Sequence, residues 1–319
     1  MEKMRKLIDD SRNIKENSLN AYMINLRKTF EAVGKGKEFN IDFLKNKEEV
    51  LKFLEKFALP TQRTYLSSYV VALDSIDSKK HEELSKFYRD ELGKVRKVLE
   101  TKVQNGERTS KQEKNWTGME ALRKVTRAMK KDLTDDDVFR KETLSKRNQR
   151  ELQDWVIANL FVGDDSNPPT RLDYAPMKVV SKKEYDDIED KSAMNYYVKN
   201  GTKPFFSFND YKTADKYGTK EVRVGKHLGK VMKEWFKHNG GDYLLYNDRG
   251  DPMTAHQLGV RVKKIFSRTG KNVTANLIRN MYISEKFPRE QRDEREEVAR
   301  KMGHSVDTQQ TIYSKKLDD

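Results

Sequence analysis

The sequence of 319 residues contains no cysteine. A disulfide framework, a thiol nucleophile and a metal site with Cys ligands are therefore excluded, and we expect a protein of a reducing compartment. Its five histidines show none of the paired His or carboxylate spacings of metal sites. We accordingly expect no metal ion.

Long apolar runs are also missing. No segment approaches the ~18 consecutive apolar residues of a membrane span. The N-terminal stretch "MEKMRKLIDDSRNIKENSLN" lacks the apolar run of a signal peptide. We therefore expect an intracellular protein without a membrane partner.

Positive charge is what the sequence has in excess. The formal net charge is +14, charged residues make up 36% of the chain, and Lys is more common than Arg. Such an excess is typical of a protein with a polyanionic partner such as a nucleic acid, because lysines that neutralise phosphates release condensed counterions. A Lys-rich surface that only keeps the protein soluble is the alternative.

The first third of the chain has the apolar spacing of helices. This spacing predicts helices at 18–34, 47–57, 59–76 and about 81–103, with Asn17 or Ser18 as the first N-cap and Pro60 in a first turn. The polar stretch 101–116 lacks an apolar period and predicts a linker. We therefore expect a helical domain over residues 1–108 and a second domain over 109–319.

The second part of the chain combines two kinds of sequence pattern. Helical spacing continues at 118–133, at 144–163 and from about 226 to the end. Between these helices, the short segments 194–200, 203–212 and 220–225 are rich in aromatic and β-branched residues and predict a small antiparallel sheet. The expected fold class is mainly α with a small antiparallel β-sheet, an α+β protein.

Three basic residues of the second domain are candidates for a site. Arg171, in "NPPTRLDYAPM", could simply pair with Asp173, and Lys212 ends a predicted strand before a turn, where Lys is ordinary. Arg279, in contrast, lies in an otherwise apolar helix, "ANLIRNMYIS". It has to pair or face a polar cleft, because burying an unpaired guanidinium is costly.

Two more candidates lie near the C-terminus. The stretch "MGHSVDTQQTIYSKK" contains a His and a Tyr nine residues apart. Taken alone, the His could cap a helix and the Tyr could fill a core. Their significance changes with the order of the polar residues along the chain, which is Arg171, Lys212, Arg279, His304 and Tyr313.

This order resembles the catalytic domain of tyrosine recombinases, the phage-integrase family. "MGHSVDTQQTIYSK" is similar to the family's Leu-Gly-His-Ser … Thr … Tyr signature, and "VTANLIRNMYIS" is similar to its His-x-x-Arg helix. The resemblance covers residues 150–319, whereas the N-terminal domain matches only as a helical DNA-clamping module. "PPTRLDY" further resembles integrases of large DNA viruses and their mobile elements.

The resemblance implies a DNA strand transferase that requires neither ATP nor metal. Tyr313 would attack a DNA phosphodiester, form a 3′-phosphotyrosine and release a 5′-hydroxyl, and a second 5′-hydroxyl would reseal the strand. Arg171 and Arg279 would bind the non-bridging oxygens, a task that suits their planar forks. His304 would be a third donor to the phosphate, and Lys212 the general acid for the leaving oxygen.

Two positions depart from the family pattern. Asn276 stands where the family usually has His. Its amide can donate to the phosphate or to Tyr313 but cannot accept a proton as imidazole does. The base for the phenol is therefore open between water, the substrate phosphate and His304. Asp173 lies two positions after Arg171, where the family's carboxylate lies three after, and would either orient Arg171 or form a surface salt bridge.

Three functions remain in view. The first is a site-specific recombinase or integrase, a monomer or dimer when free and a tetramer on DNA, in a prokaryotic cytoplasm or a eukaryotic nucleus or viral factory. The second is a type IB topoisomerase, which has the same order of residues and relaxes supercoils as a monomer. The third is an inactive basic DNA-binding protein on this fold.

Overall fold

A computed structural model gives the fold of the chain. The structure describes residues 1–288, except 13, 35, 37, 77 and 163–165, together with residue 294. His304 and Tyr313 therefore lie outside the described residues. The chain divides into two compact units, Met1–Arg108 and Thr109–Asp319.

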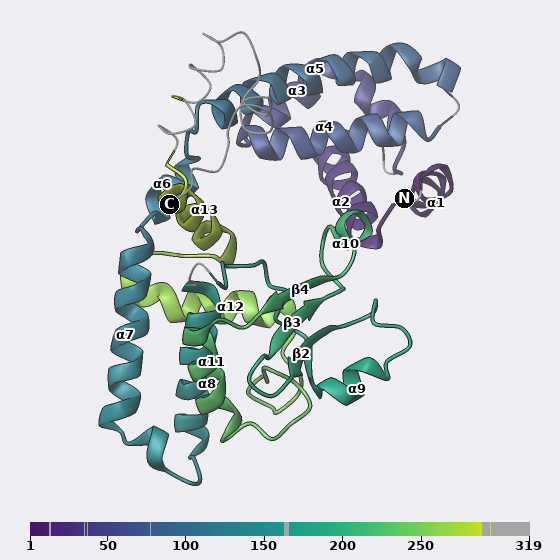
Figure 1. Cartoon of the computed structure of the whole chain (residues 1–319). Coiled ribbons are helices and arrows are strands. Elements are labelled where there is room, and N and C mark those ends of the chain that lie inside the picture. The colour runs from purple at the N-terminus through teal and green to yellow at the C-terminus, as the bar shows by residue number, and fades with distance from the viewer. Residues whose placement is uncertain are drawn as a thin grey trace. The chain divides into compact units, whose positions relative to one another are not determined.

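The first unit is a helical bundle around its own apolar core. It contains α1 (Glu2–Ser11), α2 (Glu16–Val33), the 3-10 helix η1 (Ile41–Lys45), α3 (Lys47–Glu55), α4 (Leu59–Asp74) and α5 (Ser78–Gln104) (Figure 1). The helices predicted in this region are confirmed. The sequence did not predict α1, which buries only Met4 and Ile8 and so lacks a strong apolar period. The predicted N-cap of α2 was wrong, because the helix begins at Glu16 after Lys15.

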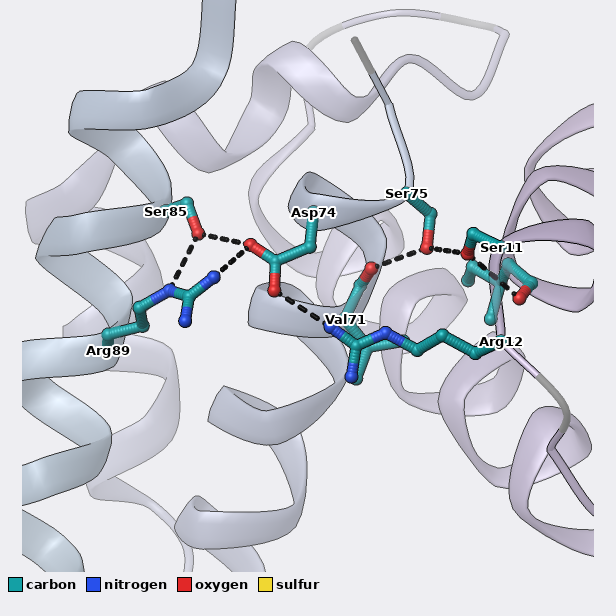
Figure 2. Close-up of polar contacts among 8 residues, drawn as sticks. Ser11, Arg12, Val71, Asp74, Ser75, Ser85 and Arg89 are labelled. Carbon is teal, nitrogen blue, oxygen red and sulfur yellow. Dashed lines mark hydrogen bonds and ion pairs between the residues drawn. The ribbon is translucent and has the colours of Figure 1, made fainter. Parts of the chain in front are cut away.

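A carboxylate joins three helices of this bundle. Asp74, the last residue of α4, accepts hydrogen bonds from Arg12 Nη2 at 2.9 Å, from Arg89 Nη2 at 2.6 Å and from Ser85 Oγ at 2.7 Å (Figure 2). Arg12 follows α1, whereas Ser85 and Arg89 lie on α5. The carboxylate therefore ties both neighbours to the end of α4.

We expect Asp74→Ala to lower the free energy of unfolding of this unit by about 1–3 kcal/mol, because one shielded acceptor serves three donors. The Asp74 side chain is 15% exposed. A matched control is Asp42→Ala, since Asp42 is 40% exposed and pairs with Lys45. Its loss should cost below about 1 kcal/mol. Urea unfolding of the full chain, followed by circular dichroism, measures both, and equal losses would contradict the role given to Asp74.

The second unit combines helices with one sheet. Its elements are α6 (Ser110–Asn115), α7 (Met119–Asp135), η2 (Val138–Arg140), α8 (Lys146–Val162), β1 (Met177–Ser181), α9 (Lys182–Asp186), β2 (Asn195–Lys199), β3 (Phe205–Phe208), α10 (Ala214–Tyr217), β4 (Lys220–Arg223), α11 (Lys226–Phe236), α12 (Ala255–Phe266), η3 (Ser267–Thr269) and α13 (Ala275–Lys286). The predicted fold class, mainly helical with a small sheet, is confirmed.

The prediction that this sheet is antiparallel was wrong for one strand pair. The strand order is β1-β2-β3-β4. The pairs β2/β3 and β3/β4 are antiparallel, whereas β1 runs parallel to β2 with Met177 opposite Asn195. The sequence did not predict β1. Residues 182–194, which include α9, form the crossover that a parallel pair requires.

The predicted linker at 101–116 also needs correction. α5 continues to Gln104, and α6 occupies Ser110–Asn115, so only residues 105–109 lie outside helices before Trp116. Thr109 Oγ1 accepts a hydrogen bond from Gln112 N at 3.2 Å, and Gln112 Oε1 accepts one from Thr109 N at 2.8 Å. This capping box forms a helix that buries none of its own residues, which is why apolar periodicity missed it.

The core of the second unit surrounds α8, which lies beside α7 and α11 (Figure 1). Trp155, Ile157 and Phe161 of α8 are buried in one cluster with Phe206 of β3 and Ile278 of α13. The sheet and α13 are thus held against the same central helix. Among the described helices, none is both long and apolar enough to cross a membrane.

Candidate functional site

The candidate site is a hollow of about 600 Å³ in the second unit. Its wall consists of the segment 168–173 before β1, the β3–β4 connection with the start of β4, and one residue of α13. Three of the predicted site residues line it, namely Arg171, Asp173 and Arg279. Residues that are far apart in the sequence therefore face one cavity.

A buried tyrosine anchors the segment that carries Arg171. Tyr174 contacts Phe161 of α8 with ring centroids 5.8 Å apart, and Phe206 and Phe208 of β3 at 5.2 and 5.7 Å. Because Tyr174 is buried between helix and sheet, the residues just before it are held at the surface. Arg171 is exposed there, and Asp173 is half-buried.

Arg279 lines the hollow from helix α13. Thr274 caps α13 by accepting a hydrogen bond from Leu277 N at 3.2 Å. Leu277, Ile278 and Met281 are buried against the core, whereas Arg279 is half-buried and lines the hollow. Arg279 therefore faces a polar hollow, one of the two alternatives that its place in an apolar helix predicts.

The charges of the hollow act on one another. Burial lowers the pKa of Arg279, and the adjacent positive charge of Arg171 lowers it further, while the Asp173 carboxylate opposes both. Burial likewise raises the pKa of Asp173, against the charges of Arg171, Lys220 and Arg279. A guanidinium nevertheless stays protonated in proteins. The two arginines therefore repel each other, and an anion between them would relieve that repulsion.

The structure places Lys212 differently from the sequence prediction. Lys212 does not end a strand: β3 ends at Phe208, and Lys212 is exposed in the turn that follows. The hollow is lined by its neighbours Tyr211 and Thr213 and by Lys220. Lys212 itself is not among the lining residues, although it stands between two residues that are.

Lys220 and Glu221, at the start of β4, are site residues that the sequence did not suggest. They lie on an edge strand with exposed side chains, where charged residues are ordinary. The only local signal for these two residues is their position at the end of the β3–β4 connection, which also contains Lys212. Their approach to Arg171 depends on the folding of the sheet onto the 168–173 segment.

The remaining predicted residues are not brought to the hollow by the described part of the chain. Asn276 is exposed in the first turn of α13, one turn before Arg279, and is not among the lining residues. His304 and Tyr313 lie beyond the described residues.

The arrangement is suited to a singly charged, oxygen-rich anion. Arg171, Arg279 and Lys220 supply three positive charges, and Asp173 and Glu221 supply two carboxylates, a formal sum of +1 when all are ionised. Arginine forks bind phosphate oxygens in pairs. A phosphodiester, with one negative charge and two non-bridging oxygens, therefore matches the hollow in charge and in hydrogen-bonding pattern.

Two comparisons found no match: no family model and no curated protein matches the sequence. The chain is similar to a crystal structure of XerA recombinase, with 11% identity, a TM-score of 0.33 and coverage of 99% of this chain and 94% of the other. It is also similar to XerH site-specific recombinase bound to its difH substrate before cleavage, with 15% identity, a TM-score of 0.45 and coverage of 98% and 84%.

Both of these proteins are recombinases. Likeness at such identities concerns the fold alone, and both TM-scores are low.

Proposed function

We propose that this protein is a site-specific DNA recombinase that cuts and rejoins DNA strands through a phosphotyrosine intermediate. The observation that carries the proposal is the shared position of Arg171 and Arg279. They come from separate elements and line one hollow with a third cation, Lys220. Paired guanidiniums are suited to the charge that develops when a phosphodiester is attacked.

The chemistry then follows from the charges and from the family resemblance. The Tyr313 oxygen attacks the phosphorus, and the bond from phosphorus to the 5′-oxygen breaks. Arg171 and Arg279 bind the non-bridging oxygens, with His304 as a third donor. Lys212 gives its proton to the leaving 5′-oxygen, and the phenolic proton passes to water, the phosphate or His304. Attack of a second 5′-hydroxyl on the phosphotyrosine reverses these steps and reseals the strand.

Asp173 has a supporting role in this proposal. Its carboxylate is half-buried beside both arginines, and its pKa is raised by that burial. It offsets part of the repulsion between Arg171 and Arg279 and so helps to keep both forks turned toward one point.

The direct test is covalent capture. A nicked duplex whose cleaved fragment diffuses away should trap the protein on DNA as an adduct that resists denaturant. Since the energy of the phosphodiester is kept in the phosphotyrosine, the adduct should form in the presence of EDTA and without ATP. An inactive DNA-binding protein on this fold would bind the duplex and form no adduct.

A second assay separates the recombinase from a type IB topoisomerase. A recombinase that acts as a tetramer should form complexes of two duplexes and exchange their strands. Steady relaxation of supercoiled DNA by monomers, without a paired-duplex complex, would identify the topoisomerase instead.

Because phosphate contacts release counterions, we expect the affinity of this protein for DNA to depend strongly on the salt concentration. The net charge of +14 provides the lysines and arginines for many phosphate contacts. For roughly 6–10 such contacts, we expect the affinity for duplex DNA to fall about 10³- to 10⁵-fold between about 50 and 200 mM salt. Fluorescence anisotropy with a labelled duplex measures the slope. An affinity that hardly changes with salt would indicate that the charge serves only solubility.

A further inference from the structure

We infer that Asn195 is a positioning residue that holds the turn of the general acid Lys212 against the segment of the phosphate-binding Arg171. This inference rests on the proposed function. Asn195 is the first residue of β2 and is 5% exposed. It lies outside the lining of the hollow, so it would act through the two segments it joins.

The amide of Asn195 uses its full hydrogen-bonding capacity between these segments. Its Nδ2 donates to the carbonyl oxygen of Asp173 at 2.9 Å and to that of Asp210 at 2.8 Å. Its Oδ1 accepts from Asn209 N at 2.8 Å and from Asp210 N at 2.9 Å. An amide offers two donor hydrogens and two acceptor lone pairs, and here all four have partners.

These four bonds connect different parts of the site. Asp173 lies two residues after Arg171, and Asp210 lies two residues before Lys212. The strands alone do not tie these segments together, because the pairing of β2 with β3 ends at the Tyr196–Ser207 pair. Asn195 continues the connection beyond the last strand pair with side-chain bonds in place of backbone ones.

The adjacent buried polar groups make this connection rigid. Asn209 Nδ2 donates to Met194 O at 2.9 Å and to Ser207 Oγ at 3.1 Å, and Ser207 Oγ also bonds to Tyr185 OH at 2.8 Å. Buried and fully paired networks of this kind fix one geometry. The backbone just before the exposed Lys212 is therefore held in place by these hydrogen bonds.

The function needs this rigidity because both segments have to meet on one phosphate. The arginine forks bind the non-bridging oxygens, while the lysine must reach the leaving 5′-oxygen of the same group. A displacement of about 1 Å in such an arrangement can cost about 10²-fold in rate. Loss of Asn195 would free the 209–213 turn and thereby weaken proton donation more than phosphate binding.

The experiment compares two DNA substrates with the full-length protein. One is the ordinary suicide duplex, and the other carries sulfur in place of the bridging 5′-oxygen at the cleaved phosphate. A thiol has a pKa of ~8.5, so the sulfur leaves as thiolate without a proton from the protein. We expect Asn195→Ala and Lys212→Ala to slow adduct formation about 10²-fold or more on ordinary DNA, the range of general-acid catalysis. On the sulfur substrate both should recover to within about 10-fold of wild type.

A second variant and a control guard against a purely structural effect. Asn195→Asp keeps the size of the side chain but turns a carboxylate oxygen toward the carbonyls of Asp173 and Asp210, and it should behave as the Ala variant. The matched control is Asn239→Ala. Asn239 is also 5% exposed in this unit, and its Nδ2 donates to Tyr243 O at 3.0 Å. Any loss in this control should be equal on both substrates.

The outcomes separate the inference from the function it rests on. Equal loss on both substrates, or no loss, in both Asn195 variants would overturn the positioning role while leaving the wild-type adduct intact. Failure of the sulfur substrate to rescue Lys212→Ala would overturn it as well, because Asn195 is held to act through that lysine. If wild-type protein forms no adduct on either substrate, the proposed function itself fails.

Discussion

Tyr313→Phe is expected to abolish the covalent protein–DNA adduct on a nicked suicide duplex, because the phenolic oxygen is the atom that bonds to phosphorus. The loss should be complete within detection, since phenylalanine has no nucleophile. Affinity for the same duplex should stay within about twofold, because only one hydroxyl is removed from a highly charged interface. Gel electrophoresis under denaturing conditions measures the adduct, and anisotropy measures the binding.

The structure offers a competing phenol as a test of this assignment. Tyr217, at the end of α10, lines the hollow and is 65% exposed. Tyr217→Phe should still form the adduct. An adduct that survives in Tyr313→Phe and disappears in Tyr217→Phe would identify Tyr217 as the nucleophile. Tyr211 is a weaker competitor, because its hydroxyl donates to Gly218 O at 2.9 Å.

Arg279→Ala and Arg171→Ala should each slow cleavage by about 10³-fold or more, as expected when an arginine that stabilises a transferring phosphoryl group is removed. Binding of uncleaved duplex should weaken far less, because many other cations contact the backbone. The Lys variants, Arg279→Lys and Arg171→Lys, should recover only part of the rate, since an ammonium keeps the charge but not the planar fork.

The control for this series lies on β4, the strand that also carries Lys220. Arg223, the last residue of β4, is exposed and is not among the residues that line the hollow. Arg223→Ala should change the single-turnover rate by less than about threefold, consistent with one peripheral charge. Equal losses for Arg223 and Arg279 would indicate that general charge, and not two positioned forks, drives the reaction. The sulfur substrate should not rescue either Arg171→Ala or Arg279→Ala, which distinguishes them from Lys212→Ala.

Much of the helical framework could be predicted from the sequence, because apolar spacing records which face of a helix is buried. In α2, Leu19, Met23 and Leu26 are buried at this spacing, whereas α4 and α8 also bury continuous runs, 68–73 and 155–162. Elements with few buried apolar residues escaped prediction. α1 buries two residues and α6 buries none, so tertiary contacts and a capping box define them.

The sheet shows a second kind of limit. β2, β3 and β4 were predictable from their aromatic and β-branched residues and pair as expected. β1 was not predicted, and its parallel pairing with β2 comes from the crossover at 182–194. A strand's own composition does not state which neighbour it will have, because pairing depends on the path of the chain between strands.

The sequence by itself determined the chemistry available to this protein: an excess of cations, no thiol, and an ordered set of Arg, Lys, His and Tyr residues. Only the tertiary structure decided that Arg171 and Arg279 share a hollow, that Lys220 lies in it while Lys212 lies in an adjoining turn, and that Asn195 joins the two segments. The physical reason is that residue type and local spacing report contacts within one element. Proximity between distant segments is set by how sheet and helices pack on a common core.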